Sequence, residues 1–133
     1  TILMADHGLN LYGNAIIVNT DYAKANSDVV KSFLVAIGKG WKDAVANPSS
    51  AIESLVKRNP AADSKLEERR FKLALSGNVM TDYVAKNGMG NIDSVRFEKA
   101  INQLSETYNY KTTPNAKLYF TDAYLPKGGF KLK

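Results

Sequence analysis

The stretch NLYGNAIIVNTDYAKANSDVVKSFLVAIGKGW, residues 10–41, contains the two patterns that decide the fold. In its first part, Gly13 stands between Tyr12 and Asn14, and the apolar run Ile16-Ile17-Val18 follows. A short run of β-branched residues bounded by Gly and Asn is typical of a strand, here over residues 14–18. A continuous apolar run suits a strand that is covered on both faces inside a sheet. The rest of the sequence offers few partners, so we expect polypeptide outside these residues to complete the pairing.

The second part of the stretch has the period of a helix. Apolar residues recur every three or four positions and predict a helix over Asp28–Ala46. We expect this helix to be the central packing element, with Phe33, Leu34, Ile37 and Trp41 buried. Gly38 and Gly40 interrupt the stripe, and each costs roughly 1 kcal/mol relative to alanine. Two such losses indicate either that a neighbouring element approaches this helix closely or that the helix bends.

The other predicted elements are one strand and four further helices. The strand is Ile2–Met4, and the helices are read from caps and breakers. They run from Asn47-Pro48 to Asn59-Pro60, from Asp63 to Leu75 with Gly77 as terminator, from Thr81 to Asn87-Gly88, and from Asp93 or Ser94 through Tyr108. The tail, residues 113–133, is predicted to hug the surface, anchored by Tyr119, Phe120, Tyr124 and Leu125. This pattern fits either a helical bundle with an irregular N-terminus or the back half of a larger α/β protein.

Composition narrows the class of protein. The 133 residues are 44% hydrophobic and 23% charged, which predicts a single globular, soluble domain. The formal net charge is +5, but the cations are dispersed, so we expect a solvated basic surface rather than a nucleic-acid interface. The chain has no cysteine, which excludes thiolate nucleophiles and cysteine-based metal sites within it. No leader pattern is visible at its start, so we expect no signal sequence in this chain.

Motifs for catalysis are weak. His7 is the single histidine, and the adjacent Asp6 could orient it, although neighbouring residues rarely point to one place. No phosphate-binding glycine loop or nucleophile elbow occurs, and Gly38-Lys39-Gly40 falls inside a helical stripe. We therefore expect no metal site and no catalytic residues. The residues alone indicate an α-rich domain without visible catalytic equipment.

A series of short motifs runs along the chain in a fixed order, namely Ala5-Asp6, Gly8, Tyr12-Gly13-Asn14, Ile16-Ile17-Val18, Lys39-Gly40-Trp41, Asn47-Pro48, Leu73–Val79, Asn87–Gly90 and Tyr124–Pro126. The order of these motifs resembles the C-terminal part of substrate-binding proteins of ABC importers. The similar branch includes binders of thiamine pyrimidine precursors, riboflavin and alkyl sulfonates. One difference is His7, where the family often has tyrosine. A larger one is that the family's N-terminal lobe has no counterpart in these residues.

The resemblance implies an α/β fold, namely the C-terminal portion of a two-lobed type II periplasmic-binding-protein fold that is helix-rich with few strands. Residues 1–13 would end the second lobe and form the hinge at Gly13. Residues 14–133 would return into the first lobe. By resemblance, the ligand-binding residues nearest the cleft are Asp6, His7, Tyr12 and Asn14, and no cofactor is implied.

The implied function is that of a solute-binding component, not an enzyme. It would capture a small organic molecule outside the cytoplasmic membrane and deliver it to an ABC permease. Contact with the membrane would run only through the permease or a lipid anchor outside this chain, and a missing N-terminal part or second chain would complete the sheet. Two alternatives stay open. One is a pyrimidine-precursor synthase of the same fold, which the lack of cysteine disfavours, and the other is an autonomous helical interaction domain.

Overall fold

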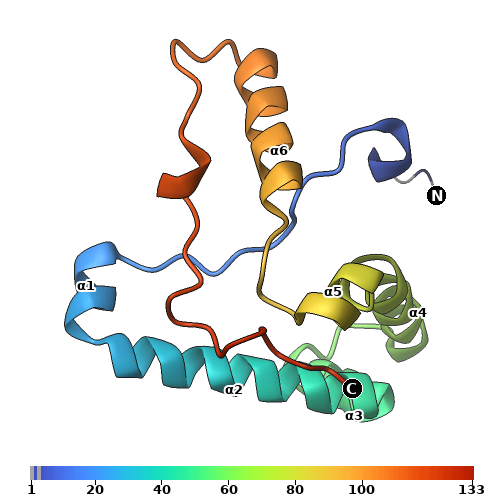
Figure 1. Ribbon diagram of the computed structural model, residues 1–133. Helices are drawn as coiled ribbons and strands as arrows, with labels where there is room; N and C mark the ends of the chain where they lie inside the picture. Colours follow the sequence, from blue (N-terminus) through green and yellow to red (C-terminus); the bar gives the residue numbers. More distant parts are fainter. Residues whose placement is uncertain (1, 3) are drawn as a thin grey trace. The chain divides into compact units, whose positions relative to one another are not determined.

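The computed structural model describes residue 2 and residues 4–133, and these form helices and irregular segments (Figure 1). The helices are α1 (Thr20–Ala25), α2 (Ser27–Ala46), α3 (Pro48–Arg58), α4 (Ser64–Ala74), α5 (Asp82–Asn87) and α6 (Ser94–Thr107). Short 3-10 helices span Met4–His7 and Ala116–Leu118, and a π-helix spans Leu75–Val79. The chain divides into two compact units. Unit 1 comprises Thr1–Ala25 and Ile92–Ala123, and unit 2 comprises Asn26–Asn91 and Tyr124–Lys133.

The expectation of a few strands is wrong for the described residues, which contain helices and one isolated antiparallel bridge, between Met89 and Phe130. Met4 begins a 3-10 helix instead of ending a strand, and Leu3 of the predicted strand Ile2–Met4 lies outside the described residues. Residues 14–18 have no regular secondary structure and form no backbone hydrogen bond with another described residue. A strand requires a paired neighbour, and the described part of the chain supplies none.

The long predicted helix is confirmed as α2, but its burial was overestimated. Phe33 is 55% exposed, whereas Leu34, Ile37 and Trp41 are half-buried. α2 packs against α3, and α3 packs against α4, so only part of the apolar stripe is covered. The Trp41 ring stacks on Phe71 at a centroid distance of 6.4 Å. Periodicity predicted the helix correctly, but it could not say how much of the stripe finds a partner.

The two glycines of α2 have different surroundings. A Cβ atom on Gly38 would collide with the Phe130 ring, because the C-terminal segment runs against α2 at this point (Figure 1). The close approach expected at Gly38 is therefore confirmed. A Cβ on Gly40 would meet nothing within 4 Å, so this glycine has no steric reason in the structure.

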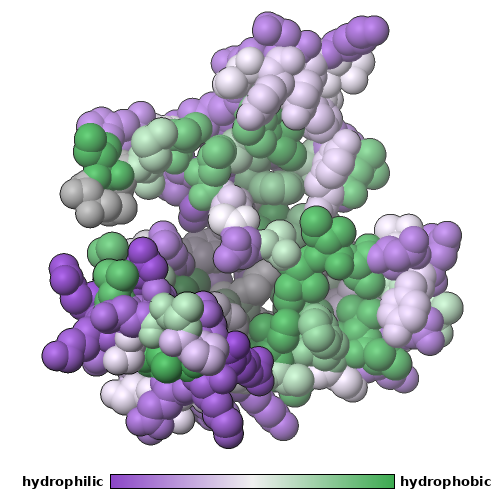
Figure 2. Space-filling model, turned by 180° about the vertical axis from the view of Figure 1, so that it is seen from behind, coloured by the Kyte–Doolittle hydropathy of each residue, from purple (hydrophilic) through white to green (hydrophobic). Residues whose placement is uncertain are grey.

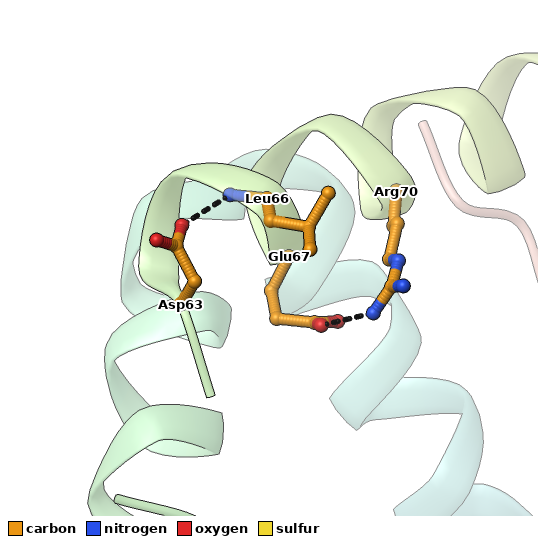
Figure 3. Close-up of polar contacts among 4 residues, drawn as sticks. All are labelled: Asp63, Leu66, Glu67 and Arg70. Carbon is orange, nitrogen blue, oxygen red and sulfur yellow. Dashed lines mark hydrogen bonds and ion pairs between the residues drawn. The ribbon is translucent and has the colours of Figure 1, made fainter. Parts of the chain in front are cut away.

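The ends of α3 and α4 follow their capping residues. Asn47 Oδ1 accepts the Ser50 N–H at 3.2 Å and precedes Pro48, as predicted for the start of α3. Figure 3 shows the start of α4, where Asp63 Oδ1 accepts the Leu66 N–H at 2.8 Å. One turn later, Arg70 Nη1 donates to Glu67 Oε1 at 2.6 Å. These local bonds explain why both starts could be predicted from sequence.

Gly77 does not terminate α4, contrary to prediction. The chain continues through it as the π-helix Leu75–Val79, which ends where the Met80 N–H donates to Leu75 O at 2.7 Å. α1 was also missed. Its start is stabilised by Asn19 Oδ1, which accepts the N–H groups of Asp21 and Tyr22 at 3.0 and 2.9 Å.

The C-terminal segment is fastened to the loop after α5. Met89 and Phe130 exchange two backbone hydrogen bonds of 2.9 Å. Gly88, at φ +81°, lies directly against the carbonyl of Gly128, where a side chain would not fit. Of the predicted anchors of the tail, Phe120, Tyr124 and Leu125 are half-buried, but Tyr119 is 67% exposed and anchors nothing.

The apolar core is small in each unit. The buried apolar residues are Ala23 and Ala100 in unit 1, and Val30, Ile52 and Leu132 in unit 2. Within the described part of the chain, no large side chain is fully buried, and apolar side chains reach the surface in many places (Figure 2). No helix in this part combines the length and apolar character that crossing a membrane requires.

Candidate functional site

Helix α6 of unit 1 organises the surroundings of the predicted site. As predicted, it begins after Asp93, whose Oδ1 accepts the Arg96 N–H at 2.8 Å. Arg96, Ala100 and Gln103 are spaced by four and three residues, so they share one face of the helix. Ala100 is buried on this face at 6% exposure. The two long polar side chains on either side of it reach the N-terminal segment.

Three side-chain bonds fasten residues 8–11 to this face of α6. Arg96 Nε donates to Asn10 O at 3.0 Å, and Arg96 Nη2 donates to Leu11 O at 2.7 Å. About two turns further along the same face, Gln103 Nε2 donates to Gly8 O at 3.0 Å. These carbonyls belong to irregular backbone, so α6 supplies donors that a sheet or helix would otherwise provide.

Tyr12 lies at the centre of a compact group, the Tyr12 cluster, formed by Tyr12, Asp93, Arg96 and Phe97. The Asp93 N–H donates to Tyr12 Oη at 2.7 Å. Arg96 Cζ lies 4.1 Å from the centroid of the Tyr12 ring, which is the geometry of a cation–π contact. Phe97 meets the same ring edge-on, with centroids 6.1 Å apart. Because Tyr12 Oη accepts in this bond, its own proton stays available to a further acceptor.

The other predicted ligand residues lie outside this network. Asp6 and His7 are exposed on the 3-10 helix Met4–His7, and Asn14 is exposed on the irregular segment after the cluster. The side chains of these three residues form no hydrogen bond or ion pair with any described residue. The structure thus connects Tyr12 to α6 and leaves the other three polar groups uncommitted.

The predicted hinge residue, Gly13, shows no conformational need for glycine here. Its φ is not among the positive values, and a Cβ atom would meet nothing within 4 Å. Positive φ occurs instead at Gly8, at +88°, which is the first of the residues fastened to α6. An alanine would fit at position 13 in this conformation, and the hinge stays a prediction.

Unit 1 also contains an open cavity of about 230 Å³, which is lined by other side chains of α6 and by residues 114–117. Its lining residues are Glu98, Ile101, Asn102, Pro114, Asn115, Ala116 and Lys117. None of the predicted ligand residues belongs to it. Across the described residues, no group of three or more His, Asp and Glu side chains could hold a metal ion.

Sequence reasoning found Tyr12 but missed the residues that hold it. Asp93 was recognised only as a helix start, and Arg96 and Gln103 were not singled out. Arg96 lies 85 residues from Leu11 along the chain, and one arginine on an amphipathic helix carries no motif. The available signal was the i, i+7 spacing of Arg96 and Gln103 beside the small residue Ala100.

Comparison with known proteins relates the N-terminal part of the chain to a protein family. Residues 1–51 match the family model described as NMT1/THI5 like. The matched range includes Asp6, His7, Tyr12, Gly13 and Asn14, and it supports a relationship of this part of the chain to a periplasmic binding-protein-like family. No curated protein matches the chain, and no solved structure matches it.

Proposed function

We propose that the chain is part of a solute-binding protein of an ABC importer, which captures a small organic molecule between two lobes. The observation that carries the proposal is the NMT1/THI5-like match over residues 1–51. A pyrimidine or thiamine precursor, a flavin and a sulfonate are the ligand classes to test. Binding sites for such molecules combine aromatic surface with a few convergent polar groups.

The residues of the N-terminal segment support this proposal. The side chains of Asp6, His7 and Asn14 are exposed and make no polar contact with described residues, so binding a ligand through them breaks no bond to the described part of the chain. Tyr12 differs, because its ring is held by Arg96 and Phe97. In the proposed site, Tyr12 stacks on the ligand or donates from its hydroxyl, and Asp6 and Asn14 form hydrogen bonds that orient it. His7 lines the same edge.

The proposal includes a lobe boundary between residues 13 and 14, directly after Tyr12. Residues 1–13 belong to the second lobe and hinge, and residues 14–133 return into the first lobe. Residues 15–18 are apolar, and residues 14–18 lack backbone partners among the described residues and include Ile17 at 92% exposure. Further polypeptide, either the other lobe or a second chain, pairs with this segment and covers it. The assembled protein works outside the cytoplasmic membrane and delivers its solute to a permease.

Thermal unfolding of the complete gene product tests this function. We expect at least one of the three ligand classes to raise the midpoint temperature, because a ligand that binds only the folded state stabilises it. The solute should be recovered chemically unchanged, which separates a binding protein from a synthase. Conversion of the solute would contradict the proposal.

Two substitutions locate the site. Asp6→Asn and Asn14→Ala should weaken the binding of that ligand by about tenfold each, which corresponds to one lost hydrogen bond. The control is Asp122→Asn, which makes the same chemical change at an exposed position in unit 1. Equal affinity for the wild type and both site variants would remove these residues from the site.

A further inference from the structure

Arg96 carries a charge that the described residues do not neutralise. The residue is half-buried, and its guanidinium forms no ion pair with a described acid. The ion pairs of the described part are Lys31–Asp28, Arg70–Glu67 and Lys72–Glu68, all in unit 2. Asp93, the acid at the start of α6, uses Oδ1 for the backbone N–H of Arg96 rather than for the guanidinium. A partly desolvated cation without a counter-ion favours the approach of an anion.

The guanidinium is also fixed in orientation. Carbonyl groups of Asn10 and Leu11 hold Nε and Nη2, and the Tyr12 ring lies 4.1 Å from Cζ. A guanidinium has five N–H donors, so these two bonds leave three of them without a partner among the described residues. Planar donors held in place bind carboxylate, sulfonate and phosphate oxygens well, because little side-chain entropy is lost on binding.

The surrounding charges do not provide an alternative partner for the guanidinium. On α6, Glu98 and Lys99 are exposed, and neither forms an ion pair with a described residue. Asp6 is exposed on the 3-10 helix Met4–His7 and is likewise unpaired. Among the described residues, Arg96 therefore combines a contact with the Tyr12 ring and N–H donors that remain free.

We infer that Arg96 binds an anionic group of the solute, so that the ligand captured beside Tyr12 is a small organic anion with a carboxylate, sulfonate or phosphate group. The position of the site rests on the proposed function, and the charge of the ligand is the new element. The Tyr12 ring then has two roles, because it lies beside the ligand and also orients the guanidinium through the cation–π contact.

The test is a titration of this chain with three simple anions, acetate, methanesulfonate and methylphosphonate, followed by NMR of the arginine Nε–H signals and the Gly13 amide. Sodium chloride at equal ionic strength is the reference. We expect at least one anion to shift the Arg96 signal in a saturable manner that chloride does not reproduce. Shifts that grow linearly and equal those in chloride would overturn the inference.

Three variants assign the effect. Arg96→Gln should weaken anion binding, read at the Gly13 amide, by about tenfold, as expected for a charge-assisted hydrogen bond. Arg96→Lys keeps the charge but lacks the planar guanidinium, so its anion affinity should lie between those of the wild type and Arg96→Gln. The control, Lys99→Gln, removes one exposed cation from the same helix and should change the affinity by less than about twofold. Equal losses of anion affinity in Arg96→Gln and Lys99→Gln would show that only the net charge matters, which would contradict a specific site at Arg96.

The outcomes separate this inference from the proposed function. If the complete gene product binds an uncharged solute and Arg96→Gln leaves that affinity unchanged, the function stands and the inference fails. If Arg96 responds to anions but no organic solute binds the complete gene product, the function fails. If Arg96→Gln unfolds, the wild-type titration and Arg96→Lys still decide the question.

Discussion

The contact between Gly38 and Phe130 makes opposite predictions for two glycines of one helix. In a helix interior, alanine is favoured over glycine by about 1 kcal/mol, so both Gly38→Ala and Gly40→Ala gain this term. A Cβ atom on Gly40 meets nothing within 4 Å, and we expect Gly40→Ala to stabilise unit 2 by about 0.5–1 kcal/mol. A Cβ on Gly38 would overlap Cδ1, Cε1 and Cγ of Phe130, which belong to a rigid ring.

The ring of Phe130 must therefore move in Gly38→Ala. Overpacking of this kind costs about 1–3 kcal/mol, which outweighs the helix term and gives a net loss of up to about 2 kcal/mol. Phe130→Ala removes the obstacle, so Gly38→Ala in that background should gain about 1 kcal/mol, as Gly40→Ala does. The reversal of sign is the specific prediction, because a general effect of alanine in α2 would give the same sign at both glycines.

Urea unfolding of the four variants measures these free energies. Trp41, the single tryptophan of the chain, lies in α2 and reports on this unit through its fluorescence. Far-UV circular dichroism verifies the helix content in each variant. The docking of the C-terminal segment on α2 would be refuted if Gly38→Ala stabilised the protein as much as Gly40→Ala does, and if the effect of Gly38→Ala were the same with Phe130 and with Phe130→Ala.

The burial of side chains and the pairing of backbone groups give three further predictions. Ile52→Ala should lower the free energy of unfolding of this chain, measured in urea, by about 2–5 kcal/mol, because Ile52 is 7% exposed. Ile17→Ala should change the same free energy by less than about 0.5 kcal/mol, because Ile17 is 92% exposed. Trp41→Ala should cost about 1–3 kcal/mol in the same assay, less than a fully buried tryptophan, because Trp41 is half-buried and keeps mainly its stacking on Phe71. In hydrogen exchange, the amides of residues 14–18 should be among the fastest to exchange in this chain, because they have no backbone partner among the described residues. The same amides should be protected in the complete gene product, and equal exchange rates in both proteins would contradict pairing with further polypeptide.

Local signals made most of the helices predictable. Asn47, Asp63 and Asp93 each accept a backbone N–H three residues later, so the start of a helix is encoded within one turn. The helical period of α2 is equally local. Burial is not, because an apolar stripe does not say which neighbour covers it, and Phe33 accordingly lies exposed at 55%.

The strand over residues 14–18 was predicted from composition, but a strand exists only when a second strand pairs with it. β-Branched residues favour extended backbone, and without a partner the segment is irregular. The candidate site shows the same limit. Tyr12 could be singled out beside Gly13, but the Asp93 N–H that binds its hydroxyl is 81 residues away, and no local pattern indicates that contact.

The central claim is that residues 1–14 contribute one side of a cleft for a small organic solute. Calorimetry with pyrimidine precursors, flavins and sulfonates, performed on this chain alone and on the complete gene product, tests that claim most directly. We expect micromolar or tighter binding of one solute by the complete gene product and at least about a hundredfold weaker binding by this chain, because enclosure on both sides supplies most of the affinity. Micromolar binding by this chain alone, or no binding of any of these solutes by the complete gene product, would contradict the claim.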